Sequence, residues 1–217
     1  MKRANQTRKH GLKSTGNPGN LLGNPKASKH GKIVPSITHH FDAFKATQAA
    51  GYLLKTSKGN RLSKIYMVKM LYDADRDQFT RTGSTITGDA PYSMEHGPIL
   101  SKILSLLDGK SKNVTWNSTI VAVDDKWFGL ATKPEEDLLN ASEKESLRNA
   151  WLKLKDLSFP QMEELFHTEY PEWEDPGKSC KPIKPETILE RAGKDKKFIA
   201  AIVAQQGEDA YMRKLFG

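Results

Sequence analysis

Apolar residues recur three and four positions apart through most of the chain after residue 40, the spacing that forms one stripe along an α-helix. The segment 61–80 has the clearest stripe, formed by Leu62, Ile65, Val68, Leu71 and Tyr72, and Gly83 follows it as a helix stop. The segment 40–56 places aromatic residues on one side and alanines beside them. The pattern therefore predicts two long helices, over 40–56 and 61–80.

Capping and stop signals mark shorter helices further along. Pro98 suits the first turn of a helix that ends at Gly109, because a first-turn residue needs no N–H partner. Ser142 and Glu145 have the spacing of a capping box, which predicts another helix start. Periodicity also predicts helices over 158–167, 185–192 and 194–205, and a short docking helix over 211–216.

The pattern changes from helical spacing to alternation over residues 114–132. Val114 and Trp116 alternate with polar residues, and two β-rich runs flank the turn at 124–126. This is typical of a β-hairpin, which would need helices to pack on. The expected fold class is mainly α (α+β): a compact helical domain over residues 35–217 with one small β-hairpin.

Residues 1–34 differ in composition from the rest of the chain. They are rich in Gly, Asn, Pro and Ser, and their few apolar residues cannot offset an ordering entropy of about 1–2 kcal/mol per residue. We expect a disordered arm that precedes the domain. The net charge of +8 arises in this arm, which has eight basic residues and no acidic one, so the domain itself is neutral.

Two interpretations of the arm stay open. It is either a cationic segment that meets nucleic-acid phosphates without sequence preference, or a solubilising extension. Nucleic acid is a candidate partner through residues 1–34, and the candidate contacts are Lys2, Arg3, Arg8, Lys9 and Lys13.

Composition also excludes several classes of protein. The longest apolar run, residues 199–204, is far shorter than the roughly 20 residues that span a bilayer, so no membrane partner is expected. The single cysteine, Cys180, excludes a disulfide scaffold. No secretory-signal pattern follows the N-terminal lysines, and we expect a cytoplasmic protein.

No catalytic, cofactor-binding or metal-binding motif stands out. The chain has no Walker loop, dinucleotide fingerprint, G-x-S-x-G, HExxH or Cys pair. Asp73, Asp75 and Asp77 alternate as in a calcium loop, but Gln78 and Ser84 stand where that loop needs Gly and Glu. We expect a solvated, capped helix end there, and no catalytic residue, metal or cofactor.

One polar set remains, formed by Asp75, Arg76, Asp89 and His96 near glycine-rich bends. An acid–arginine–histidine set of this kind is more often a buried network that fixes a loop than an active site. A partner-binding surface and catalysis by Asp89 and His96 are the alternatives.

These residues lie in segments that resemble a known family. Residues 64–76, KIYMVKMLYDADR, are similar to the K-hydrophobic-LLY-x-AD helix of the Panacea domain, found in SocA-like antitoxins. Residues 82–89, TGSTITGD, resemble its TG-x-x-I-T-GD loop, and residues 92–99, YSMEHGPI, its Y-x-A-M-x-x-GPV turn. The resemblance covers about 40–205.

A late H-x-x-x-P-x-W feature matches at His167, Pro171 and Trp173. Ser93 and Ile99 depart mildly from the family pattern, and Asp77-Gln78 replaces a frequent histidine. The residues expected to form the motif network are Tyr72, Asp75, Arg76, Gly83, Gly88, Asp89, Met94, His96, Gly97, Pro98, His167 and Trp173.

The resemblance implies an antitoxin that neutralises a cognate protein toxin by direct binding and has no enzymatic activity. Some family members are adaptors that deliver the toxin to a protease, and many are encoded on prophages, which suggests a role in phage defence. The alternative is a nucleic-acid-associated or autoregulatory phage or prophage protein that acts through the basic arm.

Aromatic side chains often anchor protein interfaces. The candidates outside the clear helix stripes are Trp116, Trp127, Phe128 and Tyr170. A place in the core is the alternative for each of them.

Overall fold

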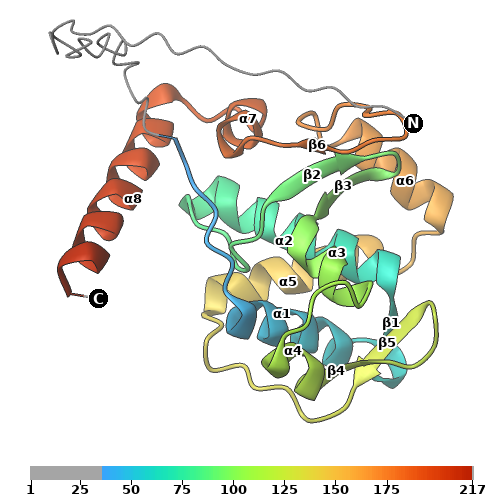
Figure 1. The fold of residues 1–217 in the computed structure, drawn as a ribbon. Helices are drawn as coiled ribbons and strands as arrows, with labels where there is room; N and C mark the ends of the chain where they lie inside the picture. Colours follow the sequence, from blue (N-terminus) through green and yellow to red (C-terminus); the bar gives the residue numbers. More distant parts are fainter. Residues whose placement is uncertain (1–35, 217) are drawn as a thin grey trace, which may run out of the picture. The chain divides into compact units, whose positions relative to one another are not determined.

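Helix α2 (Lys64–Thr82) runs through the middle of the computed structural model, which describes residues 36–216 (Figure 1). It packs most extensively on α5 (Ala141–Leu154), and α1 (Ala43–Thr56) packs on both. The side of α2 that carries Val68, Leu71 and Tyr72 is buried, so the apolar stripe read from the sequence faces the core. Gly83 ends the helix in the left-handed conformation, as expected.

The other helices of the described part are shorter, apart from the last. They are α3 (Ser101–Leu107), α4 (Val114–Thr119), α6 (Phe159–Thr168), α7 (Pro185–Arg191) and α8 (Lys196–Phe216), and a single 3-10 turn, η1 (Lys58–Asn60), follows α1. None of the helices within residues 36–216 has the length and apolarity needed to cross a bilayer.

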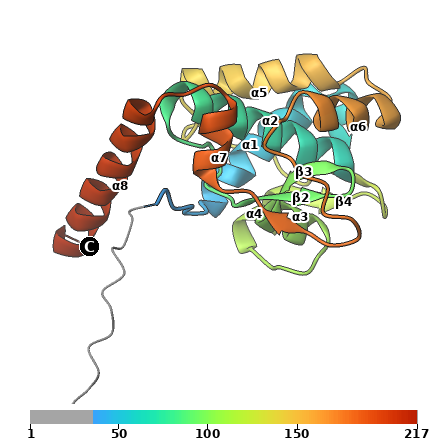
Figure 2. The same cartoon turned by 90° about the horizontal axis from the view of Figure 1, so that it is seen from above.

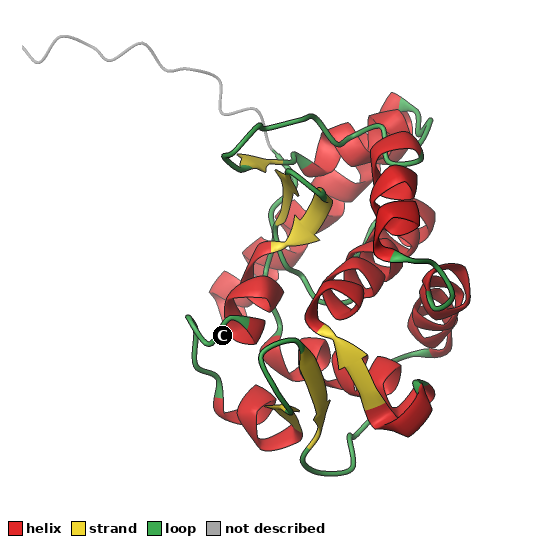
Figure 3. Ribbon diagram, turned by 90° about the vertical axis from the view of Figure 1, so that its right-hand side faces the viewer, coloured by secondary structure: helices red, strands yellow, loops and turns green. Residues whose placement is uncertain are grey.

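The strands form two three-stranded antiparallel sheets instead of the single hairpin expected (Figure 3). The first sheet has the order β1-β5-β4, from Arg61–Ser63, Trp127–Leu130 and Ile120–Ala122. The second has the order β3-β2-β6, from Gly97–Leu100, Pro91–Met94 and Lys181–Pro182. The class is mainly α with some β, which confirms the expected fold class.

Pro98 does not open a helix. The turn at Glu95 and His96 reverses the chain after Met94. Gly97 follows it with a φ of +94°, and Pro98 lies in strand β3 opposite Ser93. Because β3 is an edge strand, no further strand needs the N–H that proline lacks. Helix α3 begins after it, at Ser101.

The expected hairpin over 114–132 is present only over 120–130. Residues Val114–Thr119 are helix α4, whose first turn is capped by the Asn113 side chain, an acceptor for the Trp116 N–H at 2.9 Å. The alternation of Val114 and Trp116 reflects one exposed and one buried side of a short helix.

Two other boundaries differ from the expectation. The capping box of α5 is formed by Asn140 and Glu143, two residues before the expected pair. The helices expected over 194–205 and 211–216 are one continuous helix, α8, although Gly207 lies between them.

The buried apolar residues form two clusters. The larger lies among α1, α2, α5, α6 and the sheets, and the smaller joins Ile37 and Phe79 to side chains of α7 and α8. Figure 2 shows α7 and the start of α8 at one end of the bundle formed by α1, α2 and α5.

Candidate functional site

The family-like motif segments meet around α2, beginning with Asp75 on its buried side. The Asp75 carboxylate accepts hydrogen bonds from the N–H groups of Ile86 and Thr87, both at 3.0 Å, and from the Thr87 hydroxyl. Burial raises the pKa of Asp75 to about 7, while these three donors favour the charged form. Asp75 therefore fixes the loop after α2. The expectation of a solvated helix end at these aspartates is wrong, because Asp73 and Asp75 are both buried.

Asp89 holds the far end of the same loop. Its carboxylate accepts hydrogen bonds from the N–H groups of Ala90, Lys102 and Ile103 at 2.7, 3.1 and 2.8 Å, so it caps the first turn of α3. Burial raises the pKa of Asp89, and the backbone donors oppose the shift. Gly88, with a φ of +66°, lies so close to His40 that a Cβ would be 1.9 Å from its carbonyl oxygen.

Arg76 and Tyr72 bind one buried carboxylate, that of Glu172. The Arg76 guanidinium donates to both Glu172 oxygens at 2.5 and 3.1 Å, and the Tyr72 hydroxyl donates to Oε1 at 2.7 Å. Burial raises the pKa of Tyr72, which keeps it a donor. The segment after α6 is thereby tied to α2 by a bidentate, charge-assisted pair.

A second polar group lies one turn earlier on α2. The Tyr170 hydroxyl donates to Asp73, and Lys153 of α5 donates to the Tyr170 oxygen at 2.9 Å. The Tyr170 ring stacks on Phe166 with centroids 4.3 Å apart. Burial raises the pKa of Asp73 and also that of Tyr170. These contacts join α2, α5 and α6.

Lys69 carries a buried ammonium group from α2 to the β2–β3 turn. Its Nζ donates to the carbonyl oxygens of His96 at 2.6 Å and Pro98 at 2.9 Å, and lies 4.5 Å from the centroid of the Phe166 ring. Burial lowers the pKa of Lys69 to about 7. A Cβ at Gly97 would be 2.8 Å from both Lys69 Nζ and Phe166 Cβ, so this turn has room only for glycine.

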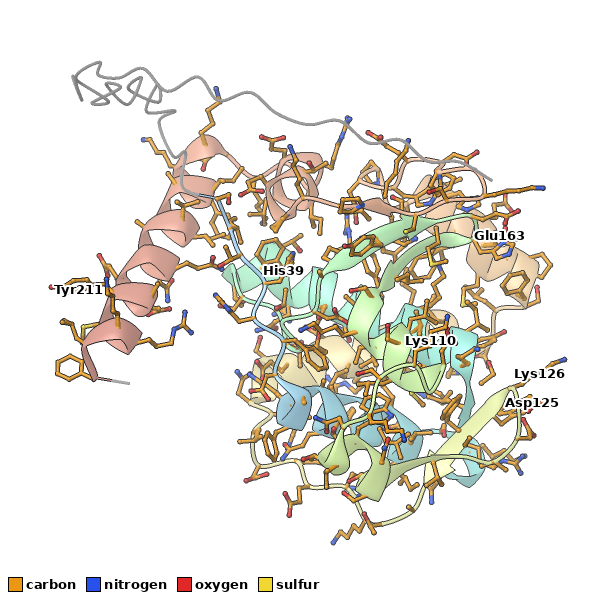
Figure 4. The ribbon with its side chains drawn as sticks, in the orientation of Figure 1. His39, Lys110, Asp125, Lys126, Glu163 and Tyr211 are labelled. Carbon is orange, nitrogen blue, oxygen red and sulfur yellow. The ribbon has the colours of Figure 1, made fainter. Side chains whose placement is uncertain are left out.

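His96, His167 and Trp173 lie on the outer side of this turn. His96 Nδ1 is 2.7 Å from a carboxylate oxygen of Glu163 on α6, at the place labelled in Figure 4. The His167 ring stacks on Trp173 at 3.9 Å, and the Trp173 indole N–H donates to the Met94 carbonyl at 2.8 Å. The structure does not pair His96 with Asp89, as catalysis by these two residues would require.

The polar side chains around α2 bind one another or backbone groups, an arrangement that positions loops. Within residues 36–216, no three His, Cys, Asp or Glu side chains are placed to hold a metal ion. Sequence reasoning missed Lys69, Asp73, Lys153 and Glu172 as members of the network. The one available signal was a lysine inside the apolar stripe of α2.

The aromatic candidates for partner contact separate into buried and exposed residues. Trp116, Phe128 and Tyr170 are buried in the core, with exposed fractions of 2, 7 and 1 %, so they are not available to a partner in this fold. Trp127 is 42 % exposed.

Trp127 lies on the outer face of the β1-β5-β4 sheet. Val123 and Val121 of the neighbouring chain segment are exposed on the same face, because alternate residues of paired strands point the same way. The Arg61 guanidinium lies 5.8 Å from the centroid of the Trp127 ring. Asp124 fixes the turn by accepting from the Lys126 and Trp127 N–H groups, both at 2.8 Å. Figure 4 shows Asp125 and Lys126 at the tip of this hairpin.

The basic arm over 1–34, with Lys2, Arg3, Arg8, Lys9 and Lys13, lies outside the described residues. Nucleic-acid binding through it stays a prediction.

Comparison with protein families agrees with the motifs. Residues 67–174 match the family model described as antitoxin SocA-like, Panacea domain. The match covers about half of the chain and is shorter than the 40–205 expected from the motifs. Neither a curated protein nor a solved structure matches the chain. The four motif segments and the network that joins them fall within or directly beside the matched residues. The chain therefore belongs, through a Panacea domain at residues 67–174, to the SocA-like antitoxins.

Proposed function

We propose that this antitoxin neutralises a cognate protein toxin by binding it directly and performs no chemistry of its own. The family assignment carries the antitoxin role in general. The internal pairing of the motif residues supports binding over catalysis, because Asp75, Asp89 and Glu172 all use their carboxylates to hold backbone or side-chain donors of the same chain.

The single observation that carries the binding site is the exposed Trp127 on the outer face of the β1-β5-β4 sheet. A tryptophan beside two valines and an arginine has the composition of an interface hot spot. The sheet is anchored by Phe128, which points into the core from the next position, so the face is rigid and loses little entropy on binding.

The test is co-expression with the product of a neighbouring gene that is toxic alone. The intact chain should restore growth, and Trp127→Ala should lower affinity for the toxin at least roughly tenfold, the usual effect of truncating a hot-spot tryptophan. Leu152→Ala on α5 is the matched control, since Leu152 is also an exposed apolar residue, and it should restore growth like the intact chain.

Stoichiometry distinguishes the routes of neutralisation. Direct binding requires one antitoxin per toxin, with the toxin still present at its full level in rescued cells. Rescue at a small fraction of the toxin's amount contradicts the proposal, and a protease-dependent loss of toxin indicates delivery to a protease instead. A toxin that binds the Trp127→Ala and intact chains equally well excludes the Trp127 face as the site.

A further inference from the structure

Helix α8 carries two apolar faces, of which one is used within the chain. Ile202 is buried, and Phe198, Ile199 and Val203 pack beside it on the smaller core cluster. Gln206 continues this inner face and accepts a hydrogen bond from the Thr38 N–H at 2.9 Å. From Gly207 to Phe216 the helix has no buried residue, and Figures 1 and 2 show this half standing clear of the other elements.

The second face, which we call the outer face of α8, lies opposite the first. Its apolar residues are Ala200, Ala201, Ala204, Tyr211, Met212 and Leu215, all of them exposed, and the charged Glu208 lies in its middle. Their spacing of three and four places them in one stripe. Figure 4 shows Tyr211, which is 63 % exposed, on the side of α8 away from the other helices.

Small and large residues are segregated along this face. The alanines occupy its first half, and the tyrosine, methionine and leucine occupy its second half. The midpoint is Gly207, where an added Cβ would meet nothing within 4 Å. Glycine within a helix is less stable than alanine, and no contact within the described chain requires it here.

We propose that the outer face of α8 pairs antiparallel with the same face of a second copy of this chain. With the two-fold axis between residues 207 and 208, Ala204 lies opposite the partner's Tyr211, Ala200 opposite the partner's Leu215, and Gly207 opposite the partner's Glu208. Each pair joins a small residue to a large one, as close packing of two helices requires. A parallel pair would place large residues against large ones.

The area available suits a reversible dimer. Tyr211, Met212, Leu215 and the alanines, taken from both copies, offer about 1,000 Å² of surface, given the size of such side chains, and that is the lower limit for a specific interface. The projecting half of α8 keeps the two bodies apart. The Trp127 face lies on a different part of the molecule from α8, so this pairing does not depend on the proposed toxin site (Figure 1).

The experiment is sedimentation equilibrium on the full chain across roughly a hundredfold range of concentration, because a dimer of this kind obeys mass action. The intact chain should change reversibly from monomer to dimer. Tyr211→Ala should raise the dissociation constant about tenfold by removing the largest contact. Ala204→Tyr should do the same, because it places two large side chains in one space.

The double variant carrying Ala204→Tyr and Tyr211→Ala exchanges the small and the large side chain of this pair. Its dissociation constant should return close to that of the intact chain. Ala210→Tyr, an exposed position off the outer face, is the control and should leave the dimer unchanged. Far-ultraviolet circular dichroism checks that each variant keeps its helix content.

A chain that stays monomeric throughout overturns the proposal. So does a double variant that is as weak as the single ones, because that result shows association without this register. Species larger than a dimer also overturn it, since a closed two-fold pair ends at two copies.

Discussion

The side chain of Lys69 brings a positive charge into the interior, where two carbonyl oxygens and one aromatic ring surround it. Burial of an ammonium group disfavours its charged form, and the partial charges of carbonyl groups compensate only in part. No ion pair of the described residues includes Lys69, although the more distant Glu163 favours its charge. The residue therefore holds the β2–β3 turn at the expense of stability near neutral pH.

This arrangement predicts a pH dependence with a definite sign. The pKa of Lys69 is about 7 in the folded chain and about 10.5 in the unfolded chain, so between these values the unfolded state binds more protons. The titration of Lys69 should therefore increase the free energy of unfolding as the pH rises from 7 to 9, because the buried ammonium group loses its charge in the folded chain. Urea titrations at both pH values measure it.

Lys69→Met removes the titrating group and should flatten this rise relative to the intact chain. Lys64→Met, at a partly exposed position on the same helix, is the control and should keep the rise. Equal pH profiles for the intact chain and Lys69→Met would contradict the assignment. Asp75, whose pKa is also about 7, contributes equally to both profiles because both chains contain it.

Sequence reasoning placed the motif residues in one neighbourhood but not in their actual pairs. Asp75 and Asp89 fix one loop, as a structural network would, whereas Arg76 turns to Glu172 and His96 to Glu163. Glu172 is nearly a hundred positions from Arg76 in the chain, so no local spacing could have indicated it. Long-range pairs of this kind depend on how helices pack.

At the scale of elements, the β2–β3 turn depends on a glycine that two other elements crowd. Gly97→Ala should destabilise the chain by about 3 kcal/mol, since it combines left-handed strain with a Cβ that overlaps Lys69 and Phe166. Thermal or urea unfolding measures the change.

Gly109→Ala is the matched control for strain alone. Gly109 has a φ of +67° and open space around its Cβ, so only the conformational cost of about 1–2 kcal/mol applies. Equal losses of unfolding free energy for the two substitutions would show that the side chains around Gly97 move aside without cost.

Elements with long, uninterrupted periodicity were predictable, and short ones were not. The apolar stripe over residues 62–72 spans about three turns and indicated the buried side of α2, and Gly83 marked its end. Val114–Thr119 makes fewer than two turns, too short for helical and alternating patterns to differ, and the Asn113 cap decided the outcome. Strands β1 and β6 are three and two residues long and form only because a longer strand lies beside them.

At the scale of the whole molecule, stability should fall from the centre of the helical bundle toward the free half of α8. Core residues of α2 and α5 are almost wholly buried, whereas residues 207–216 are exposed on every side. Local opening follows this difference in burial. Amide hydrogen exchange at low protein concentration should therefore be slowest in α2 and α5 and fastest in the last turns of α8.

The same measurement at high concentration offers an internal comparison. Amides of residues 207–216 should become protected, while those of α2 keep their rates. Slow exchange in the last turns of α8 at the lowest concentration would contradict the expected gradient.

The fully buried Leu53 and Leu54 of α1 have a consequence for any attempt to transplant this antitoxin. They belong to the same core as α2 and α5, yet they precede the stretch that matches the family model. A fragment cut at residues 67 and 174 would lose the whole of α1, with its buried leucines, and would begin partway along α2. The unit to graft onto another protein is therefore the longer piece that starts with the segment leading into α1, and the recognisable stretch by itself makes a poor module.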